Sequence, residues 1–290
     1  MIRMLCGALW ALLLCLLTAG PASAKEYAVR GMVVSVDRAH NTFTASIEEI
    51  PTFMRAMTMP FEVKRQSDLD GLAPGAVVEF ALIVDTKTSY AERIHVVAFQ
   101  NVEPDPFAAS RLALLGEIVS GNSVKPVANG EAVPDFTLTD QRKSAVRLSA
   151  LRGKVVALNF VYTSCALPNF CLRLANNFNV LQKRFASRLG RDLVLLTVTF
   201  DPVHDTPEVL AEYAAQWQAN AAVWHFLTGA QADVQRVCRM FGVHAFPNEG
   251  LMDHSLHTVV IDRQGRLVAN IEGNRFTAAQ LGDVVEGVLK

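Results

Sequence analysis

The sequence predicts a small all-β domain followed by an α/β domain, because the residue pattern changes near position 131. Between 25 and 100, short valine-rich runs alternate with turn residues, whereas from 132 onward apolar runs alternate with stretches of helical periodicity. Short strands at such spacing are typical of a small barrel, and alternating strands and helices are typical of a sheet covered by helices. Residues 101–131, punctuated by proline and glycine, are the predicted linker, and a length of 290 residues suits two domains.

The first domain, predicted over 25–100, is expected to be an OB-like barrel. Turn-forming residues interrupt its apolar runs at 37–41 and again at Pro74-Gly75. The expected strands cover 27–36, 42–45, 60–63, 76–84 and 94–99. Strands this short, separated by turns, favour a compact all-β structure.

The second domain, predicted over 132–290, is expected to have a thioredoxin-like α/β fold. Residues 154–161 form a near-continuous apolar run, which is typical of a strand buried on both faces. The pattern then predicts helices at 170–189, 207–217 and 230–241, a second buried strand at 193–200, and a hairpin of 258–262 with 267–271. Thr277 and Gln280 form a capping box that opens the last helix. Two parallel strands followed by a helix, a hairpin and a terminal helix is the thioredoxin arrangement.

Residues 1–24 are predicted to be a secretory signal peptide. An apolar stretch covers 5–17, Arg3 is the only charge before Lys25, and Ala22-Ser23-Ala24 matches a small-x-small cleavage site. We therefore expect an exported protein of the periplasm. The alternative interpretation is an uncleaved N-terminal membrane anchor, so the chain is expected to be membrane-proximal at most.

The charge and the cysteine count limit the classes of function. A formal net charge of −1 without a basic cluster argues against nucleic-acid binding. Signal cleavage would leave three of the five cysteines, namely Cys165, Cys171 and Cys238. In an oxidising compartment Cys165 and Cys171 can pair. Cys238 lies in an amphipathic helical pattern and is interpreted as a small buried residue.

Cys165 and Cys171 lie between the apolar run and the next predicted helix, where a thioredoxin-like fold presents reactive sulfur. Asn169 is a suitable N-cap, so Cys171 falls in the first helical turn, where the helix dipole is expected to lower the thiol pKa. Pro168 keeps the preceding loop out of helical conformation, so the chain can fold back. The Cys-x5-Cys spacing differs from the Cys-x2-Cys of a thioredoxin and leaves a disulfide and shared metal ligation both open.

A metal site at these cysteines needs a third ligand from elsewhere in the fold. Thiolate and imidazole ligands together suit Cu(I) or zinc. Among the seven histidines, His254 lies at the entry to a predicted strand, in the loop that thioredoxin folds place beside the cysteines. His225 lies within an apolar run and is interpreted as a core residue. His254 is the candidate ligand because of its position.

The second domain, which contains these candidate ligands, resembles the Sco (SenC/PrrC) family of copper metallochaperones. The resemblance rests on Phe-Val-Tyr-Thr-Ser-Cys at 160–165, on segments 199–207 and 260–265, and on Asp-His-Ser at 253–255. It implies a thioredoxin fold and copper bound by Cys165, Cys171 and His254. It also implies that copper is delivered to cytochrome c oxidase, or its copper centre matured, with an oxidase subunit or another periplasmic copper or thiol protein as partner. The family's usual spacing is Cys-x3-Cys, so the loop here is two residues longer.

The first domain contains a second candidate copper site. Met57 and Met59 share one side of a strand, because side chains of a strand alternate between its faces. Two thioethers suit Cu(I), and core filling is the alternative. The stretch resembles the Met-x-Met segment of the CusF-like periplasmic copper-binding domain, whose Gly-Leu-x-Pro-Gly turn recurs at 71–75. That family supplies a histidine upstream, whereas positions 46–49 hold none here, so Met54 is the candidate third thioether.

We therefore predict an exported copper-binding protein that acts as a Sco-like metallochaperone, exchanging copper between ligands without turning over a small substrate. The alternative is an enzyme, a periplasmic thiol–disulfide oxidoreductase in which Cys165 and Cys171 are the redox pair. The two hypotheses differ on His254, which metal binding needs and simple disulfide exchange does not. A third hypothesis makes the first domain an interaction module only.

Overall fold

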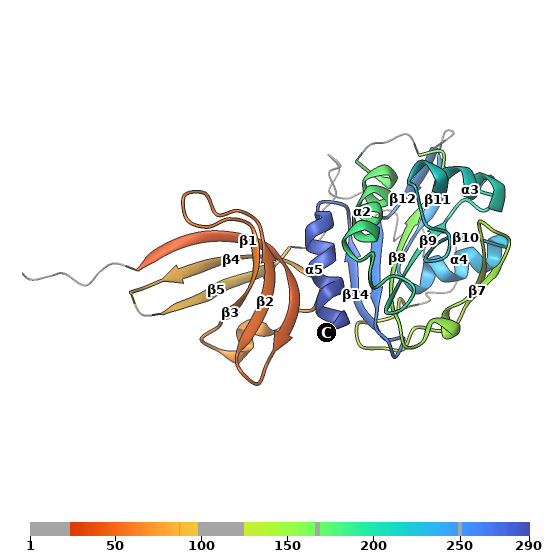
Figure 1. The fold of residues 1–290 in the computed structure, drawn as a ribbon. Coiled ribbons are helices and arrows are strands. Elements are labelled where there is room, and N and C mark those ends of the chain that lie inside the picture. Colours follow the sequence, from red (N-terminus) through yellow and green to blue (C-terminus); the bar gives the residue numbers. More distant parts are fainter. Residues whose placement is uncertain (1–23, 87, 98–124, 166–168, 249–250) are drawn as a thin grey trace, which may run out of the picture.

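The computed structural model describes residues 24–86, 88–97, 125–165, 169–248 and 251–290 (Figure 1). All but the last residue of the predicted signal peptide, most of the predicted linker and part of the loop between Cys165 and Cys171 lie outside these ranges. Within them, no helix is both long enough and apolar enough to cross a lipid bilayer.

The predicted small all-β domain is confirmed as a five-stranded antiparallel barrel. Its strands are β1 (Lys25–Asp37), β2 (Thr42–Ile47), β3 (Met57–Glu62), β4 (Val77–Val84) and β5 (Ser89–Val96), in the spatial order β3-β2-β1-β4-β5. A parallel bridge between Val63 and Ala91 joins the two ends of this order and closes the barrel. Inside, the rings of Phe43, Phe61 and Phe80 contact one another with centroids 4.9–5.5 Å apart.

The predicted thioredoxin-like domain is confirmed around a seven-stranded mixed sheet. The strands are β6 (Thr137–Asp140), β7 (Ala145–Arg147), β8 (Val155–Val161), β9 (Leu193–Thr199), β10 (Trp224–Thr228), β13 (His257–Ile261) and β14 (Leu267–Glu272), in the order β14-β13-β8-β9-β10-β6-β7. Strands β8, β9 and β10 are parallel, and every residue of β8 and β9 is buried, as expected for strands with both faces covered. A separate hairpin pairs β11 (Ala245–Asn248) with β12 (Leu251–His254).

Helices cover both faces of this sheet. They are α2 (Cys171–Arg184), α3 (Pro207–Gln216), α4 (Gln231–Met240) and α5 (Ala278–Leu289). Asn159 of β8 donates to the carbonyl of Leu174 in α2 at 3.3 Å, whereas its neighbour Phe160, on the other face, contacts Phe241 just after α4. Helices α2 and α4 therefore lie on opposite faces. The first helix ends at Arg184, earlier than the predicted 189.

The barrel packs directly on the second domain, with α5 between the barrel and the seven-stranded sheet (Figure 1). Met32 and Val34 of β1 are buried in the same hydrophobic cluster as the core of that sheet. Just before residue 132, the N–H groups of Val127 and Gly130 donate to Met240 and Leu267 of the second domain. The predicted domain ranges 25–100, 101–131 and 132–290 stay a prediction.

Candidate metal centre

The fold brings together the three candidate ligands Cys165, Cys171 and His254 from three separate elements. Cys165 lies in the loop that follows β8, Cys171 is the first residue of α2, and His254 is the last residue of β12. The two sulfurs and a ring nitrogen of His254 all lie within 4.8 Å of one another. Donor atoms this close can share one metal ion.

The two thiols are withdrawn from water. Cys171 is fully buried and Cys165 is 4% exposed, while His254 is partly exposed. No disulfide joins the cysteines of the described residues. The three candidate ligands are thus largely withdrawn from water, and His254 is the least buried of them.

His254 is held by aromatic rings and by one backbone contact. Its ring centroid lies 4.7 Å from that of Phe200 and 5.7 Å from that of Tyr162. Its Nδ1 lies 3.3 Å from the carbonyl oxygen of Ser255. Because a carbonyl only accepts, Nδ1 carries the proton in this contact, and the Nε2 lone pair is left for a metal.

The pKa of the Cys171 thiol lies well above its ordinary value, contrary to the expectation from the helix dipole. Burial is the main cause, and the neighbouring thiol of Cys165 adds to it through a hydrogen bond and its charge. A helix N-terminus acts over its first turn with a modest energy, whereas taking a thiolate out of water costs more. Metal binding at this site therefore has to displace a proton from Cys171.

Two family models match this chain. The SCO1/SenC model matches residues 125–290, and the model for the copper binding periplasmic protein CusF matches residues 26–96. The chain belongs to the SCO1/SenC family. Both matches confirm the resemblances drawn from the sequence motifs.

Individual relatives agree with this Sco assignment. The chain is 29% identical to the SCO1 protein homolog of Bacillus subtilis over 116 residues, which are 40% of this chain and 58% of that protein. It is 31% identical to a SCO2-like protein of Rickettsia prowazekii over 139 residues, 45% of this chain and 64% of that one. The chain thus spans less than two thirds of either relative. The crystal structure of a SCO1/SenC family lipoprotein from Bacillus anthracis covers 58% of this chain and 100% of that one, with a TM-score of 0.50 at 22% identity, and shows the shared fold.

The loop that carries Cys165 in this Sco domain is anchored by Asp205, which the sequence analysis did not single out. Asp205 is fully buried and accepts hydrogen bonds from the N–H and hydroxyl of Thr163 and from the hydroxyl of Thr199. Burial raises the pKa of Asp205, and the hydrogen bonds from the two threonines oppose this rise. The segment 199–207 thus reaches the metal centre through Thr163, two residues before Cys165.

A second anchor holds the start of α2. Arg173 donates to the carbonyls of Asn274 at 2.6 Å and Phe276 at 3.2 Å, and the Asn274 side chain donates to the carbonyl of Asn169. The predicted N-cap Asn169 is wrong, because the N-cap is Phe170, whose side chain has no polar atom. The tertiary contacts of Arg173 and Asn274 fix this helix end in place of a local cap.

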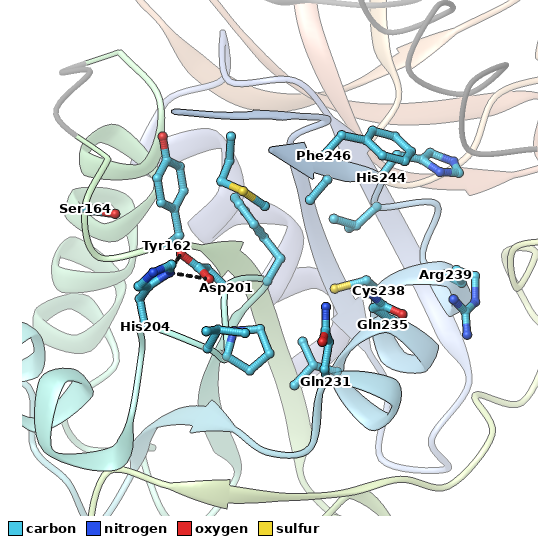
Figure 2. Close-up of a pocket in the computed structure, with 17 residues that line it drawn as sticks. Tyr162, Ser164, Asp201, His204, Gln231, Gln235, Cys238, Arg239, His244 and Phe246 are labelled. Atoms are coloured by element: carbon cyan, nitrogen blue, oxygen red, sulfur yellow. Dashed lines mark hydrogen bonds and ion pairs between the residues drawn. The ribbon is translucent and has the colours of Figure 1, made fainter. Parts of the chain in front are cut away.

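A cavity of about 670 Å³ opens beside the metal centre (Figure 2). Tyr162 and Phe200, which contact His254, also line this cavity. Cys238 of α4 lines it from the opposite side, and burial raises the pKa of its thiol to about 12. The cavity thus shares Tyr162 and Phe200 with the surroundings of His254, although none of the three candidate ligands lines it.

The methionines of the first domain lie apart from this centre. Met57 and Met59 belong to β3, and Met57 is 50% exposed. Met54 and Met59 pack against the barrel core. Of the three, Met57 is thus half exposed, whereas Met54 and Met59 are partly buried against the barrel core.

Proposed function

We propose that this chain is an exported copper metallochaperone that binds copper through Cys165, Cys171 and His254 and delivers it to cytochrome c oxidase, or matures the copper centre of that enzyme. The observation that carries the proposal is the convergence of these three donor atoms within 4.8 Å from three elements. Family membership supports the recipient, which would be a copper-receiving oxidase subunit in the periplasm.

The donor set fits copper as a cargo. Two thiolates and an imidazole are soft to intermediate ligands that suit Cu(I). Copper enters as the thiols release their protons, and it leaves when ligands of the recipient replace those of this chain one at a time. The partly exposed His254, next to the open cavity, is the ligand that a recipient can displace first.

The oxidation state of the two thiols would control copper loading. Joining Cys165 and Cys171 in a disulfide removes two electrons and two protons and takes away both thiolate ligands. The oxidised chain would then bind no copper at this centre, and reduction by a partner dithiol would restore binding.

Copper titration of the reduced mature chain tests the three-ligand site. We expect His254→Ala to weaken copper binding by at least about tenfold, equivalent to about 1.4 kcal/mol. His204→Ala is the matched control, because the exposed His204 pairs with Asp201 at the same cavity and is not a candidate ligand. Equal affinity of wild type and His254→Ala would show that the three-ligand site is wrong.

A thiol–disulfide oxidoreductase is the second candidate function, and the closeness of the two thiols beside an open cavity favours it. Disulfide exchange needs Cys165 and Cys171 but has no use for His254. If His254→Ala abolishes copper binding and leaves the reduction of a partner disulfide unchanged, the chain has both activities. If copper binding is absent from wild type as well, the oxidoreductase is the better proposal.

For the barrel we propose a Cu(I) site at Met57 and Met59, with Met54 as third thioether. Copper stoichiometry of the reduced chain tests this site, since two equivalents support both sites and one supports the cysteine site alone. Met57→Leu with Met59→Leu keeps the hydrophobic volume and removes both thioethers. An unchanged stoichiometry in this double variant would favour a barrel that serves only as an interaction module.

A further inference from the structure

The barrel and the Sco domain meet along a packed interface, which we call the seam and define by Met32, Val34, Ser46 and Thr58 of the barrel and Asp283 and Gly287 of α5. Along β1, Val33 points into the barrel core, so its neighbours Met32 and Val34 point outward. Both are nevertheless buried, at 0% and 8% exposure, within the core cluster of the Sco domain. An independent barrel would expose these apolar side chains to water.

Glycines permit this close approach. A Cβ on Gly287 of α5 would lie 2.9 Å from Cγ1 of Val34 in β1. A Cβ on Gly75, in the barrel turn before β4, would lie 2.9 Å from both Ala269 and Ile271 of β14. Glycine is a poor helix former, so Gly287 inside α5 is explained by the backbone contact that it allows.

One carboxylate ties both domains together across the seam. Asp283 of α5 accepts hydrogen bonds from the hydroxyls of Ser46 at 2.7 Å and Thr58 at 2.6 Å. It also pairs at 2.7 Å with Arg184, the last residue of α2. Two barrel strands, α5 and the far end of the helix that begins at Cys171 thus meet at Asp283.

The pairing of β3 with β2 places the barrel methionines on the face of β3 opposite to the one that contacts Asp283. Thr58 is paired with Ser46, and both face Asp283, whereas Met57 and Met59 are paired with Ile47 and Ala45. Ile47 and Ala45 belong to the barrel core. Because successive side chains of a strand alternate, Met57 and Met59 point to the barrel interior and open at its mouth, not toward the Sco domain.

The length of α2 separates the two candidate copper sites. Arg184 at the seam and Cys171 at the metal centre are the two ends of this helix, and 14 residues at 1.5 Å each span about 20 Å. Copper moves by ligand exchange only between groups that can touch the same ion. The thioethers and the thiols of one chain cannot do so while the seam is closed.

We propose that copper passes between the barrel methionines and the cysteine site only from one molecule to another, at a contact between the barrel mouth of one copy and the metal centre of a second copy. The inference rests on the proposed copper binding of both domains. The half-exposed Met57 at the barrel mouth and the cavity beside His254 are the two surfaces that meet.

The dependence of transfer on protein concentration tests this proposal. Wild-type chain with Cys165 and Cys171 oxidised is loaded with one equivalent of Cu(I) in the barrel and then reduced, and the arrival of copper at the thiols is followed by thiolate-to-copper absorption. We expect the half-time to halve when the protein concentration doubles. A half-time that is the same at every concentration would exclude a rate-limiting contact between two copies and overturn the proposal.

A mixture of two single-site variants provides the matched control. The donor is Cys165→Ser with Cys171→Ser, loaded with Cu(I), and the acceptor is Met57→Leu with Met59→Leu, so transfer between them is intermolecular by construction. We expect the same second-order rate constant as for wild type, and a faster wild type would overturn the proposal. If the donor takes up no Cu(I), the barrel part of the proposed function is wrong and this inference falls with it, while the titration of His254→Ala still decides the cysteine site.

Discussion

At the scale of single residues, burial dominates the chemistry of the metal centre. Cys171 begins α2, where the helix dipole favours a thiolate, yet its complete burial raises the thiol pKa. Tyr162 responds in the same way, since burial and the charge of Cys165 raise its pKa to about 12. The neutral thiol of Cys171 and the neutral phenol of Tyr162 are therefore the resting forms, and a bound metal has to drive the deprotonation of Cys171.

We expect His257 to contribute to the loss of stability of the fold in acid. Its ring is buried, its Nδ1 lies 2.9 Å from Oδ1 of Asn270, and burial lowers its pKa from 6.5 to about 4. Between these two pH values the imidazole of His257 is protonated in the unfolded chain and neutral in the folded chain. Its contribution to the free energy of unfolding is therefore fully present above about pH 6.5 and is lost as the pH falls toward 4. The loss reaches about 3 kcal/mol.

Urea unfolding at neutral and mildly acidic pH measures this loss. We expect His257→Asn, which keeps a donor for Asn270 and cannot be protonated, to lose less stability between the two pH values than wild type. His40→Asn is the control, because His40 is exposed. Equal pH dependence of wild type and His257→Asn would assign the acid lability to other groups.

At the scale of elements, Asp205 joins three of them near the metal centre. It follows the end of β9, precedes the first turn of α3 and holds Thr163 after β8. All three of its partners act as donors to the carboxylate. Asp205 thus helps to position Cys165 through Thr163, which lies two residues earlier in the same loop.

We expect Asp205→Asn to destabilise the fold by about 2 kcal/mol, because the amide turns one of its NH₂ donors toward a group that also donates. Copper affinity should fall as well, since Thr163 loses its anchor. Chemical unfolding and copper titration measure the two effects. Asp201→Asn is the control, because Asp201 pairs with the exposed His204, and an equal loss in both variants would contradict the anchoring role of Asp205.

The sequence was informative where function depends on short motifs and uninformative where it depends on distant contacts. Cys165 and Cys171 stand out because a buried strand and an amphipathic helix flank them, and the Asp-His-Ser motif points to His254. The hydrogen bond from Thr163 to Asp205 joins residues that are 42 positions apart, so no local sequence pattern predicts it. The expectation for the pKa of Cys171 was wrong because depth of burial belongs to the tertiary structure, not to the first helical turn.

At the scale of the whole molecule, the barrel and the Sco domain form one packed unit. A sequence signal for this exists, because Met32-Val33-Val34 is apolar on both faces of β1 instead of alternating. Burial opposes the ionisation of Asp283, but hydrogen bonds from Thr58 and Ser46 and the charge of Arg184 outweigh it and lower its pKa. The seam is therefore expected to weaken in acid, as this carboxylate becomes protonated.

We expect Asp283→Ala to cost about 1–2 kcal/mol, because two seam hydroxyls lose their acceptor. Glu286→Ala is the matched control, since Glu286 also pairs with Arg184 but has a half-exposed side chain outside the seam, and its loss should cost less than about 0.5 kcal/mol. Calorimetry should show one unfolding transition in wild type. Equal costs for both variants would mean that Asp283 contributes nothing across the seam.

The seam also sets an order of events in folding. Ser46 and Asp283 are 237 residues apart, so the barrel made early in synthesis meets its partner helix only after α5 has emerged. Until then, Met32 and Val34 on the outward side of β1 form an exposed hydrophobic surface that other chains can bind. Contacts of such long range form slowly, so a chain interrupted before α5 would hold a complete barrel that is prone to aggregate.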